Sequence, residues 1–112
     1  MAEYIHKNLW PWGWKDTIVL ADGRALCQLS IEFDNIFVAH LSDVIVHETE
    51  RQRGYGNELL KAAKKHAREM GAKMLCLWAA PDSWVIGWYK RHGFRQYCVY
   101  DDGMVGLIFD LE

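Results

Sequence analysis

The residues from Arg51 to Gly56, Arg-Gln-Arg-Gly-Tyr-Gly, could bind a phosphate-containing ligand. Gly54 and Gly56 have no Cβ, so the backbone at these positions can approach a diphosphate closely. Arg51 and Arg53 can donate charge-assisted hydrogen bonds to the same phosphate oxygens. The third glycine of a dinucleotide-binding fingerprint and the Gly-Lys-Ser/Thr of a P-loop are both absent. The hexapeptide therefore indicates either a diphosphate-binding loop or an ordinary strand-to-helix turn with basic residues on its surface.

This loop lies between a predicted strand and a predicted helix. Leu41 to Val46 is expected to form a strand because it contains three consecutive β-branched residues. Asn57 to Met70 is expected to form a helix because its apolar residues recur on one face, and Gly71 is expected to end it in the left-handed conformation. The first turn of such a helix leaves backbone N–H groups without partners at the positive end of the helix dipole. A strand, a glycine-containing loop and a helix in this order would point those groups at an anion.

A second motif ends another predicted helix. Pro81-Asp82-Ser83 is expected to begin this helix, with one of its last two residues as the N-cap. The helix closes with Trp88-Tyr89-Lys90-Arg91-His92-Gly93-Phe94. Together with Arg51-x-x-Gly54-x-Gly56, this segment resembles the GNAT family, the Gcn5-related N-acetyltransferases, in both order and interval. The resemblance covers Leu41 to Phe94 and extends to Leu111.

The resemblance implies an acetyl-CoA-dependent enzyme that transfers the acetyl group to an amine by direct attack, with no metal and no covalent enzyme intermediate. In the family, loop amides hold the diphosphate of CoA, and main-chain groups of the preceding strand hold the pantetheine arm and the thioester carbonyl. Asp82 stands where the family often has an asparagine that contacts the pantetheine, so it either makes that contact or caps the helix. The residues implied in acetyl-CoA binding are Val44, Ile45, Val46, Arg51, Gln52, Arg53, Gly54, Tyr55, Gly56, Asn57, Asp82 and Tyr89.

The resemblance also implies two catalytic residues. Tyr89 occupies the position that in many members meets the leaving sulfur, and packing against the core is its alternative role. A phenol with a pKa near 10 would give its proton to a thiolate near 8.5 uphill by about 2 kcal/mol, so hydrogen bonding to the sulfur is as credible as full transfer. His40 falls where histone-type members place a glutamate, and a neutral imidazole can accept a proton directly or through water.

The identity of the general base is left open by the sequence. Asp43 and Glu48 are the competing carboxylates, and a histidine in a strand can also be structural. Strand alternation is expected to put His40 and Ser42 on one face of the sheet and Leu41 and Asp43 on the other. The remaining histidines of the motif region are expected on the surface: His47, His66 and His92.

The predicted elements make an α/β (α+β) fold with a mixed, mostly antiparallel sheet and two main helices. Strands are expected over residues 17–20, 24–31, 36–47, 73–79, 96–100 and 104–111. The strand over 73–79 should lie parallel to the strand over 36–47, with a right-handed crossover. A chain of 112 residues has the length of one domain, residues 1–112, without room for the two N-terminal helices of the usual GNAT domain.

Three tryptophans alternate near the start of the chain. Trp10, Trp12 and Trp14 surround Pro11 and Gly13, which make a regular helix unfavourable here. The indoles are expected either to cap one end of the core or to form an aromatic wall for a substrate or a partner subunit. Their large apolar area leads to the prediction of a homodimer whose interface includes Trp10 or Trp12.

Composition excludes several classes of protein. A net charge of −2 argues against a nucleic-acid-binding protein, and no apolar run approaches the roughly 20 residues of a membrane span. The first residues lack the basic and apolar regions of a signal peptide. Cys27, Cys76 and Cys98 have no metal-ligand spacing, so they are expected to be buried thiols of a cytoplasmic protein.

The sequence therefore predicts an N-acetyltransferase, with a protein lysine or N-terminus slightly favoured over a small amine as acceptor. Two alternatives come from other functional classes. One is a GNAT-like protein that binds CoA without acceptor chemistry, and the other is a small effector that blocks a partner through its tryptophan-rich edge.

Overall fold

The computed structural model describes residues 3–20, 23–47 and 54–112, with side chains from Ile5 onward. In chain order the elements are β1 (Glu3–His6), β2 (Leu9–Trp10), β3 (Gly13–Leu20), β4 (Ala25–Glu32), β5 (Asn35–Val46), α1 (Tyr55–Glu69), β6 (Met74–Ala79), α2 (Trp84–Arg91), β7 (Arg95–Val99) and β8 (Val105–Asp110).

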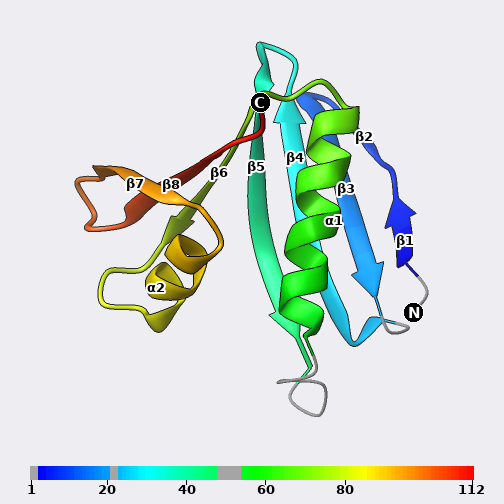
Figure 1. Cartoon of the computed structure of the whole chain (residues 1–112). Coiled ribbons are helices and arrows are strands. Elements are labelled where there is room, and N and C mark those ends of the chain that lie inside the picture. Colours follow the sequence, from blue (N-terminus) through cyan, green and yellow to red (C-terminus); the bar gives the residue numbers. More distant parts are fainter. Residues whose placement is uncertain (1–2, 21–22, 48–53) are drawn as a thin grey trace.

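The strands form one sheet in the order β1-β3-β4-β5-β6-β8-β7, with β2 paired to β3 (Figure 1). β5 and β6 pair in parallel, and the other described pairs are antiparallel. The parallel pair flanks α1 in the sequence, as expected for a strand, helix, strand crossover. The predicted fold class, a mixed and mostly antiparallel sheet with two main helices, is confirmed.

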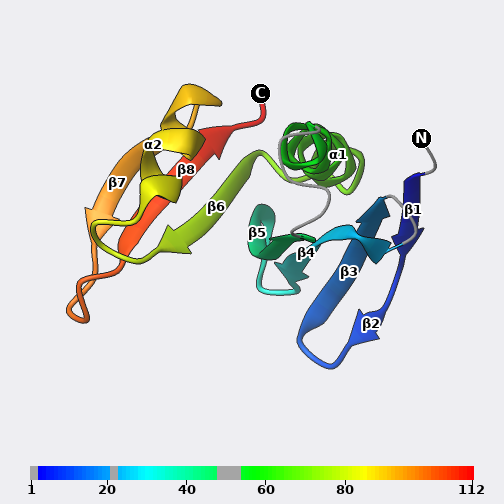
Figure 2. The same cartoon turned by 90° about the horizontal axis from the view of Figure 1, so that it is seen from below.

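Helix α1 covers one face of β3, β4 and β5 (Figure 2). Alternate residues of these strands, such as Ile18, Leu29 and Ala39, are buried, and they belong to one core together with Leu59 and Ala63 of α1. Because side chains of a strand alternate between faces, this apolar set lies on the helix side, and the residues between them face the other way.

Helix α1 begins at Tyr55, two residues before the predicted start. Gly54 is its N-cap and adopts a left-handed conformation with φ +82°, and its carbonyl accepts a hydrogen bond of 3.1 Å from the N–H of Glu58. At the other end Gly71 has φ +93°, so the predicted left-handed glycine cap is confirmed. Helix α2 is capped by Ser83, whose side-chain oxygen accepts from the N–H of Val85 at 3.3 Å.

A buried contact between a histidine and a carboxylate fixes α1 to the sheet. Nε2 of His66 lies 2.6 Å from Oδ2 of Asp16 on β3, and the N–H of Asn8 donates to Oδ1 of the same carboxylate at 3.1 Å. His66 is only 3% exposed, so the expectation of a surface histidine is wrong. The reason is its place on the helix: it lies three residues after Ala63, on the face that packs on the sheet.

The N-terminal part of the chain differs from its prediction. β3 begins at Gly13 rather than Thr17, and within residues 3–20 no helix separates β1 from β3. Trp12 is 67% exposed and Trp14 is also exposed, with its ring edge-on to Phe33 at 4.9 Å. These indoles therefore do not cap the core. Neither described helix is long and apolar enough to cross a membrane.

Candidate functional site

The site begins where β5 and β6 part. Their register runs over only three pairs, from Val38 opposite Met74 to His40 opposite Cys76. Beyond these pairs β5 continues to Val46 and β6 to Ala79, and the two strands diverge toward the N-terminal end of α1 (Figure 1). Where two neighbouring strands in the middle of a sheet separate, a ligand can enter the opening between them. The same strands could not bind it while they are paired.

A β-bulge at Asp43 bends β5 just beyond this point. Ser42 is opposite Gln28 on β4, whereas Ile45 is opposite Leu26, so β5 has one extra residue. Asp43 has φ +52°, which a non-glycine residue rarely adopts. The bulge makes two neighbouring residues, Ser42 and Asp43, exposed in succession. The expectation that Asp43 shares a face with Leu41 is therefore wrong, because simple alternation does not continue through a bulge.

A cleft of about 810 Å³ lies between the bent end of β5, the start of α1 and helix α2. This volume falls within the usual range for small-molecule and cofactor sites. The residues that line it are Val44, Ile45, Val46, Gly54, Tyr55, Gly56, Asn57, Trp84, Val85, Trp88 and Tyr89.

The N-terminal turn of α1 forms one end of this cleft, so its N–H groups and the positive end of the helix dipole face the ligand space. A Cβ added to Gly54 would meet no atom of the described residues within 4 Å, so their side chains leave the space beside it open. Arg51, Gln52 and Arg53 lie outside the described residues, and the charge they are expected to add stays a prediction.

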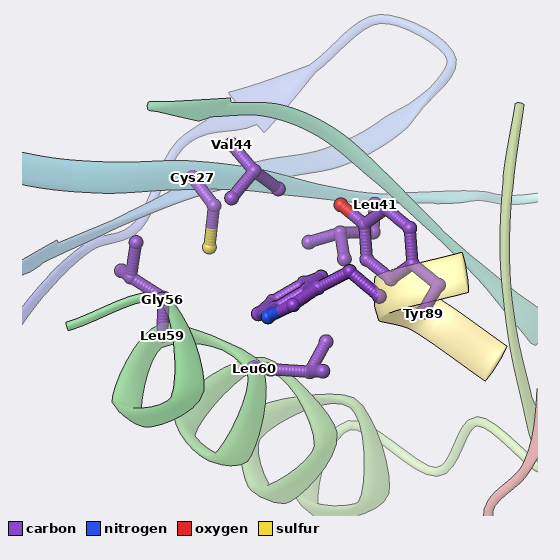
Figure 3. A pocket seen from close by; sticks show the side chains of 8 residues that line it. Cys27, Leu41, Val44, Gly56, Leu59, Leu60 and Tyr89 are labelled. Carbon is purple, nitrogen blue, oxygen red and sulfur yellow. The ribbon is translucent and has the colours of Figure 1, made fainter. Parts of the chain in front are cut away.

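The wall of the cleft near α2 is tightly packed (Figure 3). Trp88 packs beside the start of α1, and a Cβ on Gly56 would lie 3.3 Å from its Cζ2 atom. The absence of a side chain at Gly56 thus lets α2 approach α1 closely. The small space that remains holds no water-sized volume, and it is lined by Cys27, Leu41, Val44, Gly56, Leu59, Leu60, Trp88 and Tyr89.

Tyr89 belongs both to this wall and to the cleft. Its side chain is 8% exposed, with its ring edge-on to Trp88 at 4.9 Å and to Phe94 at 5.3 Å. The hydroxyl points toward Leu41 and Val44 of β5 (Figure 3). Burial, and to a lesser degree the neighbouring Cys27, raises the pKa of Tyr89 to about 12. The phenol therefore remains protonated at neutral pH and can donate a hydrogen bond.

His40 lies on the opposite face of the sheet from Tyr89. Its neighbours Ala39 and Leu41 are buried under α1, so its own side chain points away from the helix. Nδ1 of His40 is 3.0 Å from Sγ of Cys76, and its ring centroid is 5.7 Å from that of Trp78. Burial raises the pKa of the Cys76 thiol to about 11, so this partner is uncharged at neutral pH. His40 and Tyr89 thus stand on two sides of the opening.

The structure separates the other expected site residues into two groups. Val44, Ile45 and Val46 line the cleft together with Gly54, Tyr55, Gly56 and Asn57. Asp82 is exposed with φ +61°, and it does not line the cleft. Sequence reasoning missed Trp84 and Val85 as cleft residues. Their positions four residues before Trp88 and Tyr89 place all four on one side of α2, and this spacing could have identified them.

Most of the chain matches a known protein family. A family model described as an acetyltransferase (GNAT) domain matches residues 14–96. Histone acetyltransferase GCN5 from Debaryomyces hansenii is 32% identical over 81 residues, which cover 71% of this chain and 18% of that protein. The chain therefore spans less than a fifth of the length of this relative.

Two solved structures share the fold over nearly the whole chain. A GNAT-family protein from Desulfovibrio desulfuricans superposes with a TM-score of 0.80 at 11% identity, covering 99% of this chain and 100% of the other. A GNAT family acetyltransferase from Elizabethkingia anophelis with acetyl-CoA bound gives a TM-score of 0.74 at 15% identity, covering 96% and 97%. At such identities the likeness concerns the fold. Because the family model matches well over half of the residues, this chain belongs to the GNAT acetyltransferase family.

Proposed function

We propose that this protein is an acetyl-CoA-dependent N-acetyltransferase that transfers the acetyl group to a primary amine by direct attack. The observation that carries the proposal is the cleft between the N-terminal turn of α1, the end of β5 beyond its pairing with β6, and helix α2, with Tyr89 at its wall. The related structure from Elizabethkingia anophelis, which has acetyl-CoA bound in the same fold, supports the choice of cosubstrate.

In this proposal the diphosphate of CoA binds at the start of α1, where Gly54 to Asn57 offer backbone N–H groups. Arg51, Gln52 and Arg53 would add hydrogen bonds from the preceding loop. The pantetheine arm runs along Val44 to Val46, which line the cleft just beyond the bulge. Asp82 is exposed and outside the cleft lining, so its predicted contact with the pantetheine stays a prediction.

Tyr89 serves the leaving group as a hydrogen-bond donor. With the phenol pKa at about 12, full transfer to a thiolate near 8.5 would be uphill by roughly 5 kcal/mol. A hydrogen bond to the sulfur, which strengthens as negative charge develops there, stabilises the transition state without that cost.

His40 is the proposed general base. An amine acceptor is an ammonium ion at neutral pH, so it must lose one proton before attack and a second one afterwards. A neutral imidazole on the face opposite Tyr89 can take the first proton directly or through a water and release it to solvent, and the second proton ends on the sulfur of the released CoA. Among the described residues Asp43, exposed at the bulge, is the alternative, and Glu48 lies outside them.

A protein lysine or N-terminus is the favoured acceptor, because the sheet face that carries His40 has no helix of residues 3–20 over it. An open face admits a protruding side chain or a chain end. We also propose a cytoplasmic location, which agrees with three free thiols at Cys27, Cys76 and Cys98.

The test is to measure CoA and acetyl-CoA binding by calorimetry, and then thiol release over a panel of amines. Binding at micromolar concentrations followed by amine-dependent thiol release supports the proposal. Binding without release from any amine would favour the alternative, a GNAT-like regulatory protein that binds CoA without catalysis. No binding of either nucleotide would refute both.

We further propose a homodimer whose interface includes Trp10 or Trp12. Its support is a group of exposed apolar side chains that follows the β2–β3 and β4–β5 turns: Leu9, Trp12, Trp14, Phe33, Ile36 and Phe37. Patches of this kind usually mark interaction surfaces. Sedimentation at micromolar concentration should give a dimer for the wild type and a monomer for Trp12→Ala; a wild-type monomer would refute this.

A further inference from the structure

Four aromatic rings lie in continuous contact on the sheet face opposite α1. This aromatic cluster consists of His40 on β5, Trp78 on β6, Tyr97 on β7 and Tyr100 just after β7. The indole stands perpendicular to the Tyr100 ring at 5.9 Å, and the imidazole lies 5.7 Å from the indole on its other side. Trp78 is 56% exposed, although an indole of this size is usually covered by protein.

Much of the hydrogen-bond donor capacity of the aromatic cluster is taken up by bonds within the cluster. Nε1–H of Trp78 donates to the hydroxyl oxygen of Tyr100 at 2.7 Å, and the hydroxyls of Tyr97 and Tyr100 are 2.7 Å apart, which uses one of their two hydrogens. Burial and the hydrogen bond to Tyr100 raise the pKa of Tyr97, so its hydroxyl stays neutral. What remains for a ligand is mainly ring faces and oxygen lone pairs, which attract positively charged N–H groups.

A second acceptor lies on the same sheet face. Oε1 of Gln28 is buried and has no hydrogen-bond partner among the described residues. Gln28 is two residues from Ser30, which is opposite His40, and its own register partner is Ser42. A buried carbonyl oxygen without a donor costs free energy unless a ligand or water supplies one. This part of the face therefore also favours a ligand that donates hydrogen bonds.

The cluster lies beside the opening that leads to the cleft. His40 and Cys76 form the last register pair of β5 and β6, and Trp78 is the next residue of β6 on the same face. A ligand held on the exposed surface of the indole would thus meet the opening from one side. Tyr89 and the cleft approach the same opening from the side of α1.

Two cations share this sheet face at a distance. On one side, Lys15 is opposite Ser30, which is opposite His40, so Lys15 lies two strands from His40. On the other side, Arg95 is opposite Ile108, which is opposite Cys76, so Arg95 lies two strands from Cys76. Two strand spacings are roughly 10 Å, close to the Debye length in physiological salt. Both side chains are exposed, so they do not prevent one positive charge from binding at the rings, but they disfavour additional positive charges around it.

We infer that the aromatic cluster is the acceptor site and that it binds a single alkylammonium group on an unbranched stem, without neighbouring positive charges. The role of this site in acetyl transfer rests on the proposed function, whereas ammonium binding itself does not. Trp78 supplies the main ring face, the tyrosine oxygens accept N–H donors, and His40 lies at the opening, whereas Gln28 on β4 is too many strands away to contact the same ammonium group.

The probe is n-butylammonium, titrated into the CoA-saturated protein and followed by ligand-detected NMR, with 1-butanol as its uncharged analogue. We expect butylammonium to bind at least about tenfold more tightly than butanol. Trp78→Ala should weaken butylammonium about tenfold, and Trp78→Phe, which keeps a ring face, should weaken it less. Trp12→Ala removes another exposed indole, at the proposed dimer interface and outside the aromatic cluster, and should leave the affinity of each chain for butylammonium unchanged even where it yields a monomer. CoA calorimetry on each variant verifies that it is folded.

Equal binding of butanol and butylammonium, or unchanged binding in Trp78→Ala, would overturn the inference. If wild-type protein binds butylammonium through Trp78 but never releases thiol from acetyl-CoA, the proposed function fails and the ammonium site stands. If thiol release occurs but does not depend on Trp78, the function stands and the site is refuted. The charge restriction has its own test: a peptide lysine flanked by arginines should bind more weakly than one flanked by glutamates, and the reverse order would refute it.

Discussion

The two faces of the sheet are built from the same strands but have opposite character. On the face under α1, residues such as Ile18, Leu29 and Ala39 are apolar and buried. On the other face, the residues next to them in the chain, such as Thr17, Gln28 and His40, are polar and half-buried. The covered face positions a helix terminus and a backbone cleft, which suit a large cosubstrate. The uncovered face presents side chains, which suit recognition of a small acceptor group.

The largest expected effect is on the cosubstrate side. Gly54→Val should abolish detectable CoA binding, because the side chain would enter the open space beside the start of α1. Calorimetry with CoA measures this. Butylammonium binding to the opposite face should persist in the same variant, which would show that the two faces bind independently.

Gly71→Val is the matched control for this variant. Gly71 caps the other end of α1, also has positive φ, and an added Cβ there would also lie more than 4 Å from every atom of the part of the chain that the structure describes. Both variants therefore carry a similar backbone strain, on the order of 1–3 kcal/mol, but Gly71 lies far along the helix from the cleft. Equal loss of CoA binding in the two variants would mean that strain, and not occupation of the phosphate site, causes the effect.

The next effect concerns the stability of the covered face. Asp16→Ala should lower the free energy of unfolding by about 3 kcal/mol, since it leaves His66 buried without its partner. The control is the exposed pair between Lys73 and Glu112, with Nζ and Oε1 3.3 Å apart, where Glu112→Gln should cost less than about 0.5 kcal/mol. Urea unfolding measures both. A cost for Asp16→Ala as small as that of the control would contradict the role given to the buried pair.

A smaller effect is expected for the chemistry at the cleft wall. Tyr89→Phe should lower kcat about tenfold and change CoA affinity little, because the hydroxyl acts once charge develops on sulfur. Since the phenol pKa is about 12, the wild-type rate should show no loss from tyrosine ionisation up to about pH 10. Steady-state kinetics against pH tests both statements, and equal kcat values would leave Tyr89 a packing residue.

The smallest effect is a dependence of stability on alkaline pH. Burial raises the pKa of Cys27 from 9.0 to about 12 and that of Cys76 from 9.0 to about 11. Above pH 9 the unfolded chain loses these protons while the folded chain keeps them, so stability must fall as pH rises. The slope should be roughly 1 kcal/mol per pH unit for each thiol. Urea unfolding at pH 8, 9 and 10 measures it, and Cys27→Ala should make the slope shallower; an unchanged slope would contradict this assignment.

Most elements of the fold could be predicted because their signals are local. The apolar spacing of α1, its end at Gly71 and the β-branched run of β5 were all expected, with boundaries that differ by one or two residues. The start of α1 was missed because the left-handed Gly54 begins the helix earlier than the apolar pattern does. β1 and β2 were missed because the segments are short and pair only at the edge of the sheet.

The candidate site was predictable in part for the same reason. The residues around Gly54 and Tyr89 belong to two contiguous motifs, and the structure brings both to one cleft. Asp43 could not be placed, because a bulge depends on how β4 and β5 align and not on β5 alone. His66 was misplaced because its partner Asp16 is 50 residues away in the chain.

The sequence by itself determined the family, the fold class and the glycine-containing start of α1, since each depends on residues close together in the chain. Only the tertiary structure decided how far β5 and β6 stay paired, which tryptophans are exposed, and which side chains meet beyond the opening. The aromatic cluster joins residues from β5, β6 and β7 that are up to 60 positions apart, and no local pattern connects them. Such contacts depend on strand order and register, and these are set by the packing of the whole sheet.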